Sequence, residues 1–89
     1  MTDPTLAEAR AAIDQVDRVL LAAVNERLEL VRSLHDHKVA TGLELHDPGR
    51  EEAMLASLTQ ANSGPLSAEG VVELFRYLLD LTRRELHGE

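Results

Sequence analysis

The sequence contains no cysteine and no tryptophan, and it has one Phe and one Tyr among its 89 residues. Without Cys, neither a disulfide nor a thiolate metal site can stabilise so short a chain. A domain of this length buries little surface, so association with a second chain is the common remedy that remains. No apolar run approaches the roughly 20 residues of a membrane span, and no signal peptide pattern is present. We therefore expect one cytoplasmic domain over residues 1–89.

Basic residues are also scarce. Nine Lys and Arg face 16 Asp and Glu, which leaves a formal net charge of −7. Because phosphate binding requires a basic face, this balance argues against nucleic acid as a partner. Hydrophobic residues make up 44% of the chain, which excludes a disordered protein. A composition poor in aromatics and rich in Leu, Ala, Glu and Arg is typical of helix bundles, so we predict an all-α fold.

The first helix is predicted to begin at Asp3-Pro4 and to end before Gly42. Asp3 can cap the N-terminus, and Pro4 suits the first helical position. No Gly or Pro lies between Pro4 and Gly42, so the helix can run for about 37 residues, or roughly 55 Å. A helix of this length exposes its apolar stripe unless another chain covers it, which favours a homodimer.

A second helix is predicted from Pro48 to about Ala61. Asp47 repeats the start signal and can serve as the N-cap before Pro48. Arg50 and Glu51 would lie in the first turn, where an acidic side chain favours the helix dipole. These three polar residues therefore have an ordinary structural explanation beside any functional one.

A third helix is predicted from Ser67, as N-cap, to about Leu86. The segment Asn62–Pro65 breaks the chain between the two helices, and Gly70 weakens the third helix slightly. We see no strand pattern and no internal repeat. The predicted architecture is three helices per chain, in the order long, short, medium.

The first predicted helix carries cations inside its apolar stripe. Two series of residues at seven-residue steps share one face of about 120°. Their apolar members are Leu6, Ile13, Leu20, Val24, Val31 and Leu34. Arg10, Arg27 and Lys38 occupy steps of the same two series. Because burying an unpaired charge is costly, a pocket that holds an anion is one way to stabilise this arrangement.

Each of these cations also has a structural explanation. Arg10 could pair with Asp14 or Asp17 at helical spacing. Arg27 could extend its guanidinium to the surface, and Lys38 lies near a helix end, where cations are favourable. Their presence together on one stripe favours a functional anion site.

The sequence offers little support for a metal or a cofactor. His35 and His37 lie on different sides of their helix, which disfavours a metal site with His46. There is no Gly-rich phosphate loop and no arrangement of Ser, His and Asp that indicates nucleophilic catalysis. Met54 and Phe75 are interpreted as core residues. We predict neither a metal nor a cofactor.

An ordered set of motifs runs along the chain: Arg10, Ile13-Asp14, Val16-Asp17, Glu26-Arg27, Lys38 and Asp47-Pro48-Gly49-Arg50-Glu51. This set resembles the all-helical chorismate mutases, the type II family. The family has an Arg three residues before an Ile-Asp pair, a further hydrophobic-Asp pair, a Glu-Arg pair, a Lys near the helix end, and a D-P-x-R-E segment. The resemblance covers nearly the whole chain, including the order of helix lengths.

The resemblance implies a cofactor-free isomerase that converts chorismate to prephenate in phenylalanine and tyrosine biosynthesis. In the family, two chains interlock through the long first helix, and each of two sites takes one Arg from the other chain. By position this is Arg10, which would hold the enolpyruvyl carboxylate. Arg27 would hold the ring carboxylate, and Lys38 would lie by the ether oxygen.

The resemblance also assigns residues beyond the first helix. Asp47, Arg50 and Glu51 would meet the ring hydroxyl. Thr82 stands where the family often has a Ser near the ring carboxylate. Leu86 departs from the family pattern, because this position usually holds a Gln or Glu that is the second donor to the ether oxygen.

Leu86 cannot donate a hydrogen bond, and its neighbour Glu85 is turned about 100° around the helix. Losing such a donor costs roughly 10²–10³ in rate in comparable oxyanion sites. Two interpretations remain open. Either the register of the third helix differs, or the enzyme is weak alone and gains activity from a shikimate-pathway enzyme, as some bacterial members do by docking on the first enzyme of that pathway.

Two other functions fit the same features. Isochorismate pyruvate-lyases and aminodeoxychorismate mutases share the scaffold and the cationic stripe. Glu51 slightly favours a ring hydroxyl, whose hydrogen bond a carboxylate can accept. The second alternative is a non-catalytic helical dimer that binds a partner, for which Leu86 is the best support.

Overall fold

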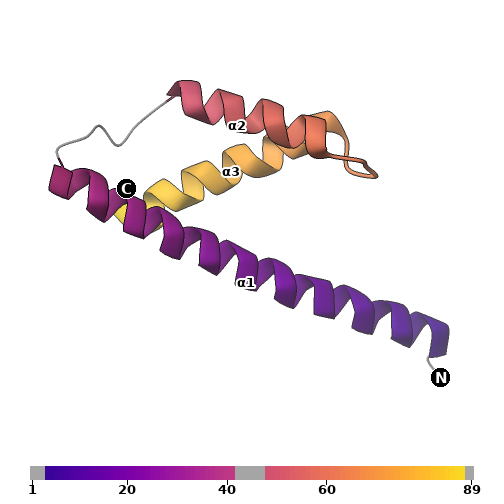
Figure 1. Ribbon diagram of the computed structural model, residues 1–89. Helices are drawn as coiled ribbons and strands as arrows, with labels where there is room; N and C mark the ends of the chain where they lie inside the picture. The colour runs from indigo at the N-terminus through magenta and orange to yellow at the C-terminus, as the bar shows by residue number, and fades with distance from the viewer. Residues whose placement is uncertain (1–3, 42–47, 88–89) are drawn as a thin grey trace. The chain divides into compact units, whose positions relative to one another are not determined.

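The computed structural model describes residues 4–41 and 48–87, with side chains placed over residues 5–37 and 48–86. Its elements are α1 (Pro4–Thr41), α2 (Pro48–Ala61) and α3 (Ala68–His87), so the prediction of an all-α chain with long, short and medium helices is confirmed (Figure 1). Residues 1–34 and 35–89 form two structural units. Within the described ranges, no helix combines the length and the apolar character that crossing a membrane would require.

Helix α1 is a single helix of 38 residues that starts at the predicted Pro4. The predicted cap Asp3 and the predicted stop Gly42 lie outside the described residues. Most of its apolar stripe is exposed in the single chain: Ile13 is 59% exposed and Leu20 is 54% exposed, while Val24 and Val31 are half-buried. Burying such side chains is worth roughly 1.5–3 kcal/mol each, so a chain with this surface gains stability when the stripe is covered.

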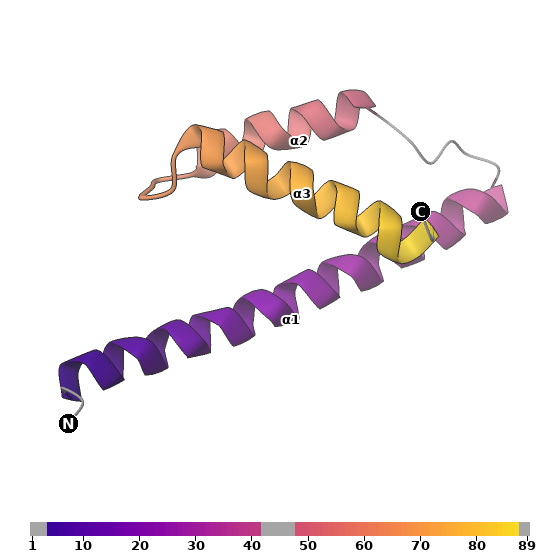
Figure 2. The same cartoon turned by 180° about the vertical axis from the view of Figure 1, so that it is seen from behind.

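Helices α2 and α3 pack against each other and lie side by side in both views (Figures 1 and 2). The centre of their contact is formed by Leu55 of α2 and Val71 of α3, each only 3% exposed. Met54 and Phe75, predicted as core residues, are half-buried. This helix pair therefore has a small hydrophobic core of its own, and it aligns the start of α2 with the second half of α3.

The connection between α2 and α3 is held by local hydrogen bonds. The side-chain amide of Asn62 donates to the carbonyl of Leu66 at 2.6 Å, and its oxygen accepts from the backbone N–H of Gly64 at 3.1 Å. Gly64 has a φ of +81°, a conformation that side chains with a Cβ rarely adopt. This loop follows the predicted break after Ala61 and reverses the chain direction.

The start of α3 confirms Ser67 as the N-cap. Its hydroxyl oxygen accepts from the backbone N–H of Gly70 at 2.9 Å. A Cβ on Gly70 would lie 2.6 Å from a methyl carbon of Leu66, so the glycine makes room for that side chain. The residue predicted only to weaken the helix therefore also allows the loop to pack against the first turn of α3.

Candidate functional site

The start of α2 and the second half of α3 meet through charged side chains. One terminal nitrogen (Nη2) of Arg83 donates to both carboxylate oxygens of Glu51, at 2.9 and 2.7 Å. The other (Nη1) donates to Oδ1 of Asp80 at 2.7 Å. The side chain of Glu51 is 27% exposed and that of Arg83 is 37% exposed. The Glu51 carboxylate is thus partly buried, charge-balanced and held in one orientation.

Thr82 lies next to Arg83 in α3 and is buried, with 8% of its surface exposed. Its hydroxyl donates to the carbonyl of Leu78 at 2.6 Å. Leu86 follows one turn later and is half-buried, whereas Glu85 is exposed. By the four-residue spacing, Leu86 shares a face of α3 with Thr82, whereas Glu85 lies on another face.

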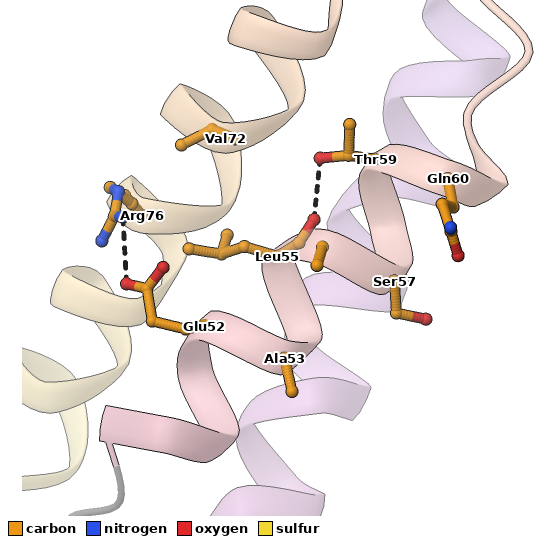
Figure 3. A pocket seen from close by; sticks show the side chains of 9 residues that line it. Glu52, Ala53, Leu55, Ser57, Thr59, Gln60, Val72 and Arg76 are labelled. Atoms are coloured by element: carbon orange, nitrogen blue, oxygen red, sulfur yellow. Dashed lines mark hydrogen bonds and ion pairs between the residues drawn. The ribbon is translucent and has the colours of Figure 1, made fainter.

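A second ion pair joins the same two helices near the middle of α3. Nη2 of Arg76 donates to Oε1 of Glu52 at 3.1 Å, and both side chains are more than half exposed. Figure 3 shows this pair at one end of an open groove between α2 and α3. The groove is lined by Glu52, Ala53, Leu55, Ala56, Ser57, Thr59, Gln60, Val72 and Arg76. None of these residues is among those predicted to bind substrate.

The predicted cations of the first helix lie on α1. Arg10 is exposed and Arg27 is half-buried in the single chain. Lys38 lies within α1, but its side chain is outside the described residues, as is the whole of Asp47. Arg50 is exposed in the first turn of α2, next to Glu51. The structure therefore brings Glu51 close to α3, while Arg10 and Arg27 belong to the other structural unit.

A metal site formed by histidines would involve His35, His37 and His46, and the sequence disfavours it. His46 lies outside the described residues. In the part of the chain that the structure describes, no three His, Cys, Asp or Glu side chains are grouped so that they could hold a metal ion.

Arg83 is the residue that the sequence did not reveal. It lies 32 residues from Glu51, and no periodic pattern connects the two positions. The only local signal was its helical spacing to Asp80, which by itself indicates an ordinary surface ion pair. The packing of α2 on α3 is what makes Arg83 a neighbour of a predicted site residue.

Residues 9–86 match the family described as Chorismate mutase type II. Two structures of a chorismate mutase from Thermus thermophilus, Form I and Form II, are similar to this one, and each is 35% identical in sequence. The Form I chain has a TM-score of 0.85, with 88% of this chain and 98% of that chain covered. The Form II chain has a TM-score of 0.84, with 88% and 89% covered. Fold and sequence therefore point to the same family.

A bifunctional chorismate mutase/prephenate dehydratase from Neisseria gonorrhoeae is 36% identical over 77 residues, which cover 86% of this chain. The matched segment is 21% of that protein, so the chain spans about a fifth of the length of this curated relative. The corresponding enzyme from Aquifex aeolicus is 28% identical over 78 residues, which are 83% of this chain and 22% of that protein. With the family match over residues 9–86 and the shared three-helix fold, the chain belongs to the chorismate mutase type II family, a family of isomerases.

Proposed function

We propose that this domain converts chorismate to prephenate, a step of aromatic amino acid biosynthesis. The observation that carries the proposal is the family match over residues 9–86, together with three cations on the stripe of α1. The reaction is a unimolecular Claisen rearrangement, in which the ether C–O bond breaks as a new C–C bond forms. No proton, electron or leaving group departs, so the protein needs no nucleophile and no general base.

The chemistry of the substrate explains the choice of cations. Chorismate is a dianion that must be held in a compact chair before it reacts, which is catalysis by orientation. Arg10 and Arg27 suit its two carboxylates because a guanidinium can bind both oxygens of one carboxylate. Lys38 suits the ether oxygen, where negative charge gathers in the transition state, because its ammonium is a compact point charge.

The spacing along α1 supports a site shared between two chains. Arg10 and Arg27 are 17 residues apart, which is roughly 25 Å along a helix axis. This separation is several times the length of one Arg side chain, so one small substrate is not enclosed by both residues of the same helix. We infer an intertwined homodimer in which Arg10 of the partner subunit completes a site built around Arg27 and Lys38. The exposed apolar stripe of α1 supplies a surface for such a dimer.

The ring hydroxyl would be met by Asp47, Arg50 and Glu51. A carboxylate can accept the hydrogen bond of that hydroxyl, and Glu51 already lies in a fixed orientation against α3. Thr82 would contact the ring carboxylate. Its hydroxyl now donates to the carbonyl of Leu78, so it would have to turn from that bond to donate to the substrate.

The direct test is to add the purified protein to chorismate, follow the loss of ultraviolet absorbance and identify the product by chromatography. We expect prephenate. Pyruvate released from isochorismate, with no turnover of chorismate, would instead identify a lyase of the same scaffold, and an amino-substituted product from aminodeoxychorismate would identify the related mutase. An intact dimer that turns over none of the three substrates would contradict an enzymatic role for the chain alone.

Leu86 is expected to limit the rate. Replacing Leu86 with Gln supplies a second donor toward the ether oxygen, and one such donor is worth roughly 10²–10³ in rate in comparable sites. We expect Leu86→Gln to raise kcat by about 10- to 100-fold, since a new side chain recovers only part of that factor. Steady-state kinetics on chorismate measures the gain, and Leu86→Met is the control that changes shape without adding a donor.

If the Gln and Met variants have the same kcat, the ether oxygen is not reached from position 86. A low kcat in the native chain that rises when a shikimate-pathway enzyme is added would instead support activation by a partner. That result would explain how a chain with an apolar residue at this position functions.

A further inference from the structure

The guanidinium of Arg83 links two helices through three short hydrogen bonds. Two of them go to the two carboxylate oxygens of Glu51 on α2, and the third goes to Asp80 on its own helix. Asp80 is 66% exposed, so the solvent end of the arrangement is the aspartate and the more buried end is Glu51. Asp80 thus holds Arg83, and Arg83 holds Glu51.

The Arg76–Glu52 pair joins the same helices, but it has fewer and longer hydrogen bonds and is more exposed to solvent than the Arg83–Glu51 pair. It has one hydrogen bond of 3.1 Å, to a single carboxylate oxygen, and its side chains are 55% and 65% exposed. Exposed pairs of this kind contribute little to stability and leave both side chains free to exchange with water. An ion pair can therefore join α2 and α3 without hydrogen bonds to both carboxylate oxygens and without the partial burial found at Arg83 and Glu51.

The Arg83 contacts have two chemical consequences for Glu51. A carboxylate held at both oxygens has a fixed plane, and its remaining lone pairs can still accept a hydrogen bond from a ligand. The positive charge also offsets the negative charge of Glu51. Without it, an unpaired and partly buried carboxylate would repel a dianionic substrate.

We propose that Arg83 is a positioning residue for substrate binding. Provided that the domain acts on chorismate as proposed above, Arg83 orients Glu51 as the acceptor for the ring hydroxyl and screens its charge from the substrate carboxylates. Arg83 acts through Glu51 and does not itself touch the substrate. Asp80 restrains Arg83 from the solvent side, so the orientation of the site depends on a residue at the surface of α3.

The test compares Arg83→Met with Arg76→Met. Both variants remove an Arg from α3 that pairs with a Glu on α2. We expect Arg83→Met to lower kcat/KM by about 10- to 100-fold, the range for losing a hydrogen bond to a charged group, and Arg76→Met to change it less than about threefold. The loss should lie mainly in KM, because the ring hydroxyl is bound in both the ground state and the transition state.

A purely structural role would give a different result. It would lower the midpoint of thermal unfolding and the fraction of active protein, which reduces kcat and leaves KM unchanged. A loss confined to kcat, or an effect no larger than that of Arg76→Met, would overturn the proposal. The wild-type rate separates this outcome from failure of the proposed function, in which case the native chain itself would not turn over chorismate.

Two further variants complete the test. In a Glu51→Gln background, Arg83→Met should lower kcat/KM by less than about threefold, because the effect of Arg83 passes through the Glu51 carboxylate. Arg83→Lys keeps the charge but cannot bridge Glu51 and Asp80 with a planar fork, so we expect a KM between those of wild type and Arg83→Met. If Arg83→Met does not fold, a wild-type KM in Arg83→Lys would contradict the positioning role.

Discussion

Replacing Arg27 with Ala is expected to lower kcat/KM for chorismate on the order of 10³-fold or more. Arg27 is half-buried on α1, and we propose that it holds the ring carboxylate with a guanidinium that can reach both oxygens. Its removal loses several kcal/mol of transition-state stabilisation, because the substrate is no longer held in the reactive chair. Steady-state kinetics with chorismate measures the loss.

The matched control is Arg32→Ala. Arg32 lies five residues farther along the same helix, on a different face, and its side chain is 60% exposed. It makes a weak 3.7 Å contact with Glu29, so its removal should leave kcat/KM within about twofold of wild type. Equal activity in wild type and Arg27→Ala would refute the anion site on the stripe and would favour the structural explanation of these cations.

Mixing two inactive variants is expected to restore activity. If Arg10 acts in the site of the other chain, a mixed dimer of Arg10→Ala and Arg27→Ala chains contains one intact site and one doubly defective site. Equal amounts that reassociate at random form half mixed dimers, so about a quarter of the wild-type sites should return. Against variants reduced on the order of 10³-fold, this is a gain of several hundredfold.

The control for this experiment is a mixture of Arg27→Ala and Lys38→Ala. Both residues are proposed to act from the same chain, so neither site of a mixed dimer would be intact and activity should stay low. The chains are mixed in denaturant, refolded and assayed with chorismate. Recovery in both mixtures would show that Arg27 and Lys38 are not supplied to a site by the same chain, and recovery in neither would argue against a site shared between chains.

Much of the local structure follows from a few residues with strong conformational preferences. Pro4 and Pro48 begin helices at the predicted positions, and Ser67 caps α3 through a hydrogen bond to Gly70. Prolines, caps and turn residues act over three or four positions, so their effects can be seen in a linear pattern. That the cations of α1 share one face follows in the same way from helical periodicity alone.

Other features depend on where side chains are placed in the folded chain. Gly70 is required by the approach of Leu66, and the Thr82 hydroxyl donates to the carbonyl of Leu78, four residues earlier in the same helix. A threonine in a helix has this intrahelical bond as one of several options, so residue type alone does not specify it. The half-burial of Leu86 and the exposure of Glu85 are likewise known only from the structure.

The sequence by itself determined the three helices, their bounds, the apolar stripe with its cations and the membership of the family. These features rest on spacings of a few residues or on an ordered set of motifs along the chain. Only the tertiary structure decided that Arg83 donates hydrogen bonds to Glu51, since 32 residues separate them and the contact exists only when α2 packs on α3. The physical reason is that propensities and periodicity act locally, whereas the partner of a charged side chain is chosen by the packing of helices that are distant in the chain.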